Sequence, residues 1–94
     1  MRLLPVYFLY HPRLECFVGK KDPTYAINAG DDQQSDAHWW AAKQDMARAW
    51  TGLDGMKRFL RLCDSSKLHN FIVVGTDASE TRADMLVQVQ TSSR

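Results

Sequence analysis

The sequence predicts a small α+β domain in which an antiparallel sheet of about five or six strands carries one main helix on one face. Three observations support this prediction. The chain opens with a short apolar run, Leu3 to Tyr10, whose aromatic content is typical of a strand. Leu53 to Cys63 carry apolar residues at helical spacing. Turn-forming residues separate further short apolar segments, and 94 residues are enough for one domain, residues 1–94.

The first thirty residues predict three strands. Leu3 to Tyr10 is expected to be buried on both faces, and Pro12 in the following turn ends its ladder of hydrogen bonds. Leu14 to Val18 alternates as a strand does, so the two segments predict an opening hairpin. After a basic turn, Tyr25 to Ala29 is predicted as a third strand, and a polar loop follows over Gly30 to Asp36.

Residues 36–50 hold all three tryptophans and have two interpretations. As a single helix, the segment would place Trp39, Met46 and Trp50 close to one face. As strand, turn and strand, Ala37 to Ala42 would pair with Tyr25 to Ala29, and a helical turn would follow over Lys43 to Arg48.

The spacing of Trp40, Ala47 and Trp50 favours the second interpretation. This spacing resembles a pattern in many small bacterial and phage proteins, where a strand ends in tryptophan and a short turn leads to a capped helix. The resemblance implies that Trp40 and Trp50 belong to the core and that Trp39 points to the other face. Thr51 and Asp54 would form a pair like a capping box.

The second half of the chain predicts one helix and two strands. Leu53, Met56, Leu60 and Cys63 lie at core spacing, so Leu53 to Cys63 is predicted as the main helix. The remaining elements are a central strand over Asn70 to Val74, a polar loop over Gly75 to Asp84, and a final edge strand over Met85 to Val89 that could pair with another chain.

The net charge of +1 argues against a nonspecific nucleic-acid coat and equally against an acidic mimic of DNA. The charge is nevertheless uneven along the chain. Residues 31–45 sum to −3, including Asp31 and Asp32, whereas residues 46–70 sum to +3. Such asymmetry favours oriented binding to a partner over any particular chemistry.

No motif indicates a reaction, a metal or a cofactor. Cys16 and Cys63 both fall on apolar faces, which indicates reduced core thiols, although a disulfide is open if the fold brings them together. The histidines and cysteines lack the spacing of zinc ligands. The apolar run at the amino terminus is too short for a membrane span and lacks a signal-peptide cleavage site. We therefore expect a cytoplasmic protein that is not an enzyme.

Two features are candidate interaction sites. The first is Trp39, which is flanked by acidic residues such as Asp31 and Asp32, because exposed tryptophans are enriched among residues that carry binding energy. The second is the basic face of the main helix, which would bind phosphate or an acidic partner surface. Its members are Lys57, Arg58 and Arg61, with Arg48 and Lys67 nearby. The aromatic run YFLY is similar to the platforms of single-strand RNA binders but lacks the rest of that pattern.

The predicted function is noncatalytic binding to a host protein or ribonucleoprotein complex, which the chain would block or modulate. Small size, near-neutral charge, uneven charge and the lack of a reaction motif resemble phage-encoded inhibitors of the anti-CRISPR type. That resemblance implies a location in the cytoplasm of a bacterial host. Two alternatives stay open. One is a nucleic-acid-binding accessory protein that uses the basic helix face, and the other is an oligomer that binds or sequesters a small ligand with the tryptophan region as a lid. Formation of a homodimer stays open as well.

Overall fold

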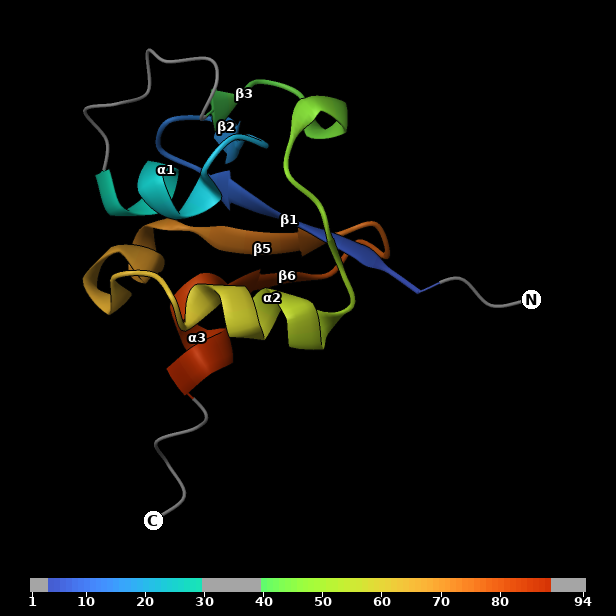
Figure 1. Ribbon diagram of the computed structural model, residues 1–94. Coiled ribbons are helices and arrows are strands. Elements are labelled where there is room, and N and C mark those ends of the chain that lie inside the picture. Colours follow the sequence, from blue (N-terminus) through green and yellow to red (C-terminus); the bar gives the residue numbers. More distant parts are fainter. Residues whose placement is uncertain (1–3, 30–39, 89–94) are drawn as a thin grey trace.

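An antiparallel sheet with β1 near its centre is the framework of the fold (Figure 1). The computed structural model describes residues 4–29 and 40–88. The strands are β1 (Val6–His11), β2 (Cys16–Val18), β3 (Trp40–Ala41), β4 (Trp50–Thr51), β5 (Ile72–Gly75) and β6 (Glu80–Arg82). The helices are α1 (Pro23–Ala29), α2 (Leu53–Leu60) and α3 (Ala83–Gln88), with two 3-10 helices, η2 (Gln44–Met46) and η3 (Ser65–Asn70).

The strand order is β3-β2-β1-β5-β6, and β4 also pairs with β1. β4 pairs near the start of β1, where Tyr7 lies opposite Trp50. β2 pairs near the end of β1, where Tyr10 lies opposite Phe17. Both pairings are antiparallel. The predicted α+β class, with five or six antiparallel strands and one main helix, and the predicted opening hairpin are thus confirmed.

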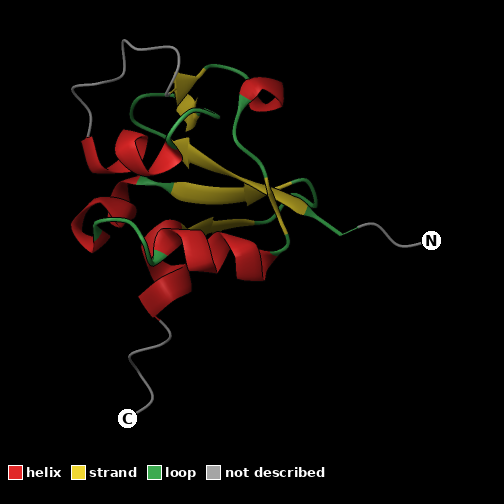
Figure 2. Ribbon diagram, viewed as in Figure 1, coloured by secondary structure: helices red, strands yellow, loops and turns green. Residues whose placement is uncertain are grey.

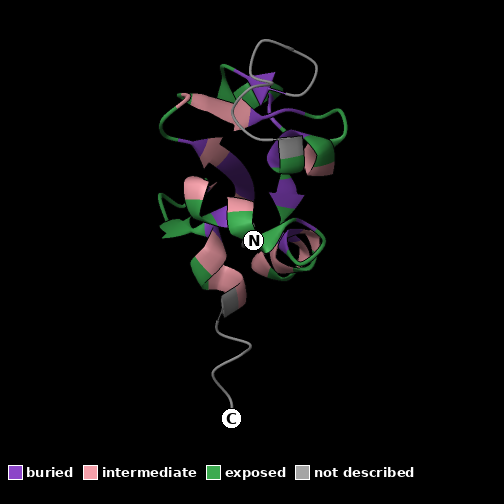
Figure 3. Ribbon diagram, turned by 90° about the vertical axis from the view of Figure 1, so that its left-hand side faces the viewer, coloured by how far each residue is buried: buried purple, intermediate pink, exposed green. Residues whose placement is uncertain are grey.

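All three α-helices cover one face of the sheet. Because side chains alternate along a strand, Tyr7, Leu9 and His11 share one face of β1. This face packs against apolar residues of α1, α2, η3 and α3 in the main core, among them Ile27, Met56, Leu60, Leu68 and Ala83. α1 and α2 lie in front of the sheet in Figure 1 and to one side of it in the turned view of Figure 3.

The opposite face of the sheet holds a smaller apolar cluster. Its buried members are Phe8, Ala41 and Ala47, and the half-buried Val6, Phe17 and Val74 pack against them. None of these residues belongs to an α-helix. The described part of the fold is therefore two-layered, with the three α-helices on one side only.

α2 forms where the main helix was predicted and ends at Leu60, three residues before the predicted end. Its inner stripe is confirmed, because Met56 and Leu60 are buried, Cys63 is buried just beyond it and Leu53 is partly buried. The predicted capping pair of Thr51 and Asp54 is wrong, since the N-cap is Gly52 and no side chain caps the helix. Gly52 has a φ of 77°, a conformation that glycine adopts at little cost.

The predicted strand over Tyr25 to Ala29 is wrong, because these residues form α1. The Asp22 carboxylate accepts a hydrogen bond from the Tyr25 N–H (3.2 Å), and Pro23 occupies the first helical position. An acidic cap followed by proline is a helix start, and this local signal outweighs the β-branched and aromatic content of the segment. α1 then buries Ala26 and Ile27.

In the described part of residues 36–50 the strand-turn-strand interpretation is confirmed, and the single helix is wrong. β3 and β4 are joined by a loop that contains η2, as Figure 2 shows. The predicted pairing of this region with Tyr25 to Ala29 is wrong, because β3 pairs with β2, with Val18 opposite Trp40. Since residues 23–29 are helical, β2 is left with a free edge that β3 occupies.

The predicted carboxyl-terminal strand over Met85 to Val89 is also wrong in its described part. These residues belong to α3, and the predicted loop over Gly75 to Asp84 contains the edge strand β6. Ala83, Leu86 and Val87 lie at helical spacing and pack into the main core. In the part of the chain that the structure describes, no helix combines the length and apolar character that crossing a membrane requires.

Candidate binding surface

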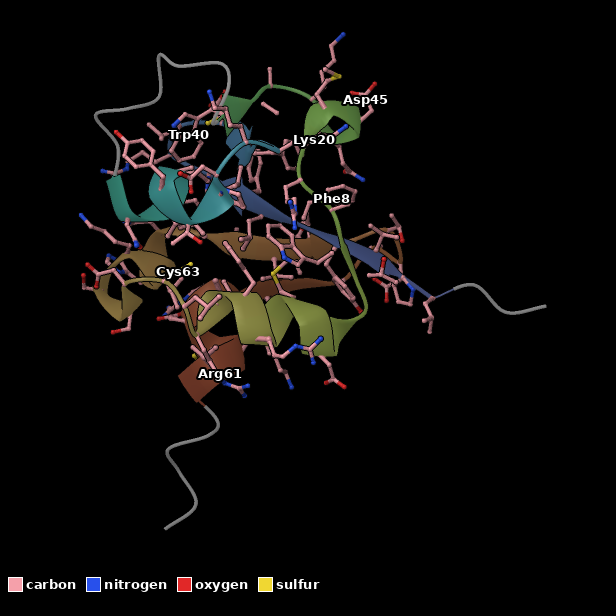
Figure 4. The ribbon with its side chains drawn as sticks, viewed as in Figure 1. Phe8, Lys20, Trp40, Asp45, Arg61 and Cys63 are labelled. Carbon is pink, nitrogen blue, oxygen red and sulfur yellow. The ribbon has the colours of Figure 1, made fainter. Side chains whose placement is uncertain are left out.

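The outer side of α2 carries the cations that the sequence singled out. Because Met56 and Leu60 turn inward, Arg58 and Arg61 are left exposed and Lys57 is half-buried. No residue in the described ranges forms an ion pair with any of these three cations. Figure 4 shows Arg61 at the end of α2, beside α3. The predicted basic helix face is therefore a surface of accessible positive charge.

An exposed leucine lies among these cations. Leu62 follows Arg61 directly and comes about one helical turn after Arg58, and it is 73% exposed. Its N–H donates to the Phe59 carbonyl (2.9 Å), which continues the turn of α2. Sequence reasoning missed Leu62, although its position off the inner apolar stripe was the available signal. We call Arg58, Arg61 and Leu62 the α2 outer surface.

Arg48 extends this surface beside α2. Its guanidinium carbon lies 5.5 Å from the centroid of the Trp50 ring, in a cation–π contact. Trp50 in turn packs on Phe59 of α2, with ring centroids 4.7 Å apart. Trp50 is buried and Arg48 is exposed. Through Trp50 and Phe59, Arg48 is thus connected to α2, the helix that carries Arg58.

The first candidate site, which consists of a tryptophan and two acidic residues, is not covered by the described residues. Trp39, Asp31 and Asp32 lie outside the described residues. Trp40 and Trp50 are buried, as predicted for the core. The Trp40 ring stacks on Phe71 at a centroid distance of 6.2 Å and meets His11 edge-on at 6.2 Å. Its indole N–H is buried without a hydrogen-bond partner in the described part of the chain.

Other charged side chains near α2 are already engaged. Arg82 donates to both carboxylate oxygens of Asp84, at 3.0 and 2.7 Å, and these hydrogen bonds lower the pKa of Asp84. Asp64 accepts from the N–H and hydroxyl of Ser66 and caps η3, which lowers its pKa as well. Arg58 and Arg61 differ from these groups because neither forms an ion pair with another described residue, and we call such a charge uncompensated.

Both described thiols are kept in their protonated form. Burial raises the pKa of Cys63 to about 11 and raises the pKa of Cys16 in the same direction. The Cys63 thiol donates to the Phe59 carbonyl at 3.6 Å. Both cysteines are free, so the reduced-thiol interpretation is confirmed and the disulfide alternative is wrong. Since the thiolate is the reactive form, neither sulfur is activated at neutral pH.

Residues 4–29 and 40–88 contain no group of three or more His, Cys, Asp or Glu side chains that could hold a metal ion. Comparison with protein-family models, with curated proteins and with solved structures finds no match for this chain.

Proposed function

We propose that this chain is a noncatalytic binding protein that uses the α2 outer surface to dock on an acidic protein surface within a host complex. Docking would block or modulate that complex. The observation that carries this proposal is the exposed Leu62 beside the uncompensated charges of Arg58 and Arg61.

The combination favours a protein partner over a nucleic acid. Arginine is enriched in protein interfaces and pairs with carboxylates through two parallel hydrogen bonds. An apolar side chain beside arginines gains binding energy when a partner covers it and excludes water. A nucleic-acid phosphate backbone would bind the arginines but would offer Leu62 no apolar contact. We therefore assign the site to an acidic protein surface with an apolar depression at its centre.

The same proposal includes the class of host complex on which the chain docks. The likeness to phage-encoded inhibitors of the anti-CRISPR type supports a target in the bacterial cytoplasm. Small size and an uneven charge distribution support the same class of target. A docked chain of this kind would occupy a subunit-contact or nucleic-acid-binding surface of the complex.

The test first captures the partner protein and then measures its affinity for the chain. Tagged chain is incubated with bacterial lysate, with and without nuclease, and retained proteins are identified by mass spectrometry. The partner is then purified, and its affinity is measured for wild type and for the variants Arg58→Glu and Leu62→Ser. Each substitution is expected to weaken binding about tenfold or more, as for residues at the centre of an interface.

Two matched variants lie away from α2. Lys43→Glu reverses an exposed charge, and Met46→Ser removes a side chain that is 61% exposed. Both are expected to bind as wild type does. Partners that disappear with nuclease, together with no loss of affinity in Leu62→Ser, would contradict the proposal and favour direct nucleic-acid binding. Equal losses in all four variants would contradict the choice of surface.

A further inference from the structure

A separate groove lies where the end of α2, η3 and α3 meet. Its volume is about 470 Å³, at the smaller end of the roughly 300 to 1,000 Å³ that small-molecule sites occupy. Leu60, Leu68 and Val87 line it with apolar surface. Leu60 and Leu68 are buried core residues, so this part of the wall is rigidly placed.

The groove also has a polar rim with one uncompensated charge. Arg61, Ser65 and Asp84 line it together with the apolar residues. Asp84 does not repel an anion as a bare carboxylate would, because Arg82 donates to both of its oxygens and forms an ion pair at 2.7 Å. Arg61 has no ion-pair partner among the residues that the structure describes. The remaining local charge available to a ligand is therefore positive.

We propose that this groove binds a small organic anion with an apolar body, such as a medium-chain carboxylate. The hydrocarbon body lies against Leu60, Leu68 and Val87, where it loses contact with water. The carboxylate accepts hydrogen bonds from the Arg61 guanidinium, and the planar fork of arginine suits a carboxylate. The Ser65 hydroxyl on the same rim is a second donor.

This site is distinct from the proposed docking function. Two of the three residues of the α2 outer surface, Arg58 and Leu62, do not line the groove, whereas Arg61 belongs to both. Binding of a small ligand to the groove can be measured without any protein partner. A negative result for one proposal therefore does not contradict the other.

The test uses octanoate and its uncharged analogue octanol as probes. Amide chemical shifts of the isotopically labelled chain are followed by NMR during titration with each probe. Octanoate is expected to give saturable shifts that cluster at Ser65, Leu68 and Val87. Arg61→Glu is expected to weaken octanoate binding about tenfold, the usual scale for a hydrogen bond to a charged group, and to leave octanol binding within about twofold.

Two further variants distinguish specific binding of octanoate by Arg61 from a general attraction of octanoate to positive charge. Arg58→Glu carries the same charge change on the same helix but lies outside the groove, so octanoate binding is expected to stay within about twofold of wild type. Arg61→Lys keeps the positive charge and is expected to recover most of the affinity that Arg61→Glu loses. All these substitutions replace exposed side chains, so the fold is retained.

Three results would overturn the proposal. The first is the lack of saturable shifts with octanoate. The second is an equal loss of octanoate binding in Arg58→Glu and Arg61→Glu, which would indicate nonspecific attraction to a basic surface. The third is binding of octanoate in the groove only when a protein partner is also bound, which would assign the groove to the docking interface instead.

Discussion

Leu60 and Leu62 allow a direct test of how α2 is oriented. The two leucines are separated by one residue, yet Leu60 is 1% exposed and Leu62 is 73% exposed. On a helix, positions two apart point about 200° away from each other, so one faces the core and the other faces solvent. Replacing each in turn by alanine makes the same chemical change in two opposite environments.

The expected costs differ by several kcal/mol. Leu60→Ala removes methyl groups from the main core and leaves a cavity next to Met56 and Leu68, which costs about 2 to 5 kcal/mol of unfolding free energy. A domain of this size has a stability of roughly 5 to 14 kcal/mol, so the loss is a large share of the total. Leu62→Ala removes an exposed side chain and is expected to change stability by less than about 0.5 kcal/mol.

Urea unfolding followed by tryptophan fluorescence and circular dichroism measures both values. Trp40 and Trp50 are buried, so their emission reports the loss of the core. A comparable loss of stability in the two variants, or a larger loss in Leu62→Ala, would refute the orientation of α2. It would also refute the assignment of Leu62 to the α2 outer surface.

Three further predictions concern the backbone, a helix cap and a thiol. Gly55→Ala is expected to raise the free energy of unfolding by about 0.5 to 1 kcal/mol, because Gly55 lies within α2 and the added methyl group meets open space. Gly52→Ala is expected to lower the free energy of unfolding by about 1 kcal/mol or more in the same urea assay, because Gly52 has a φ of 77°. Asp22→Ala removes the cap of α1 and is expected to cost about 1 kcal/mol, whereas Asp22→Asn keeps a capping oxygen and costs less; thermal melts of the two variants check this order. Cys63 keeps its proton in the folded state up to pH about 11 but releases it near 9.0 when unfolded, so the folded state binds more protons between these values and stability falls as pH rises through this window. Urea midpoints from pH 8.5 to 11 are expected to fall less steeply in Cys63→Ala than in wild type, and identical slopes would contradict the raised pKa.

Local signals were sufficient where one periodicity was unambiguous. The stripe of Leu53, Met56, Leu60 and Cys63 fits only a helix, and the opening hairpin follows from a turn at Pro12 between two apolar segments. Both were therefore predictable from sequence. The basic side of α2 was predictable for the same reason, because fixing the inner stripe of a helix also fixes its outer residues.

Local signals failed where short segments satisfied two patterns. The described part of Met85 to Val89 is compatible with alternation and with helical spacing, and contact with η3 and α2 decides for α3. Tyr25 to Ala29 has strand-like side chains, yet the cap at Asp22 and the burial of Ala26 and Ile27 decide for α1. A segment of five to seven residues carries too little propensity to resist such packing forces.

By itself, the sequence determined the class of this protein: a small α+β domain with one amphipathic helix, an opening hairpin and a basic outer helix face. These features depend on spacing within one segment. The tertiary structure alone decided that β3 pairs with β2, that β4 joins β1, and that α2, η3 and α3 enclose a groove beside Arg61. Each of these depends on contacts between residues far apart in the chain, which burial of apolar surface selects and local periodicity does not encode.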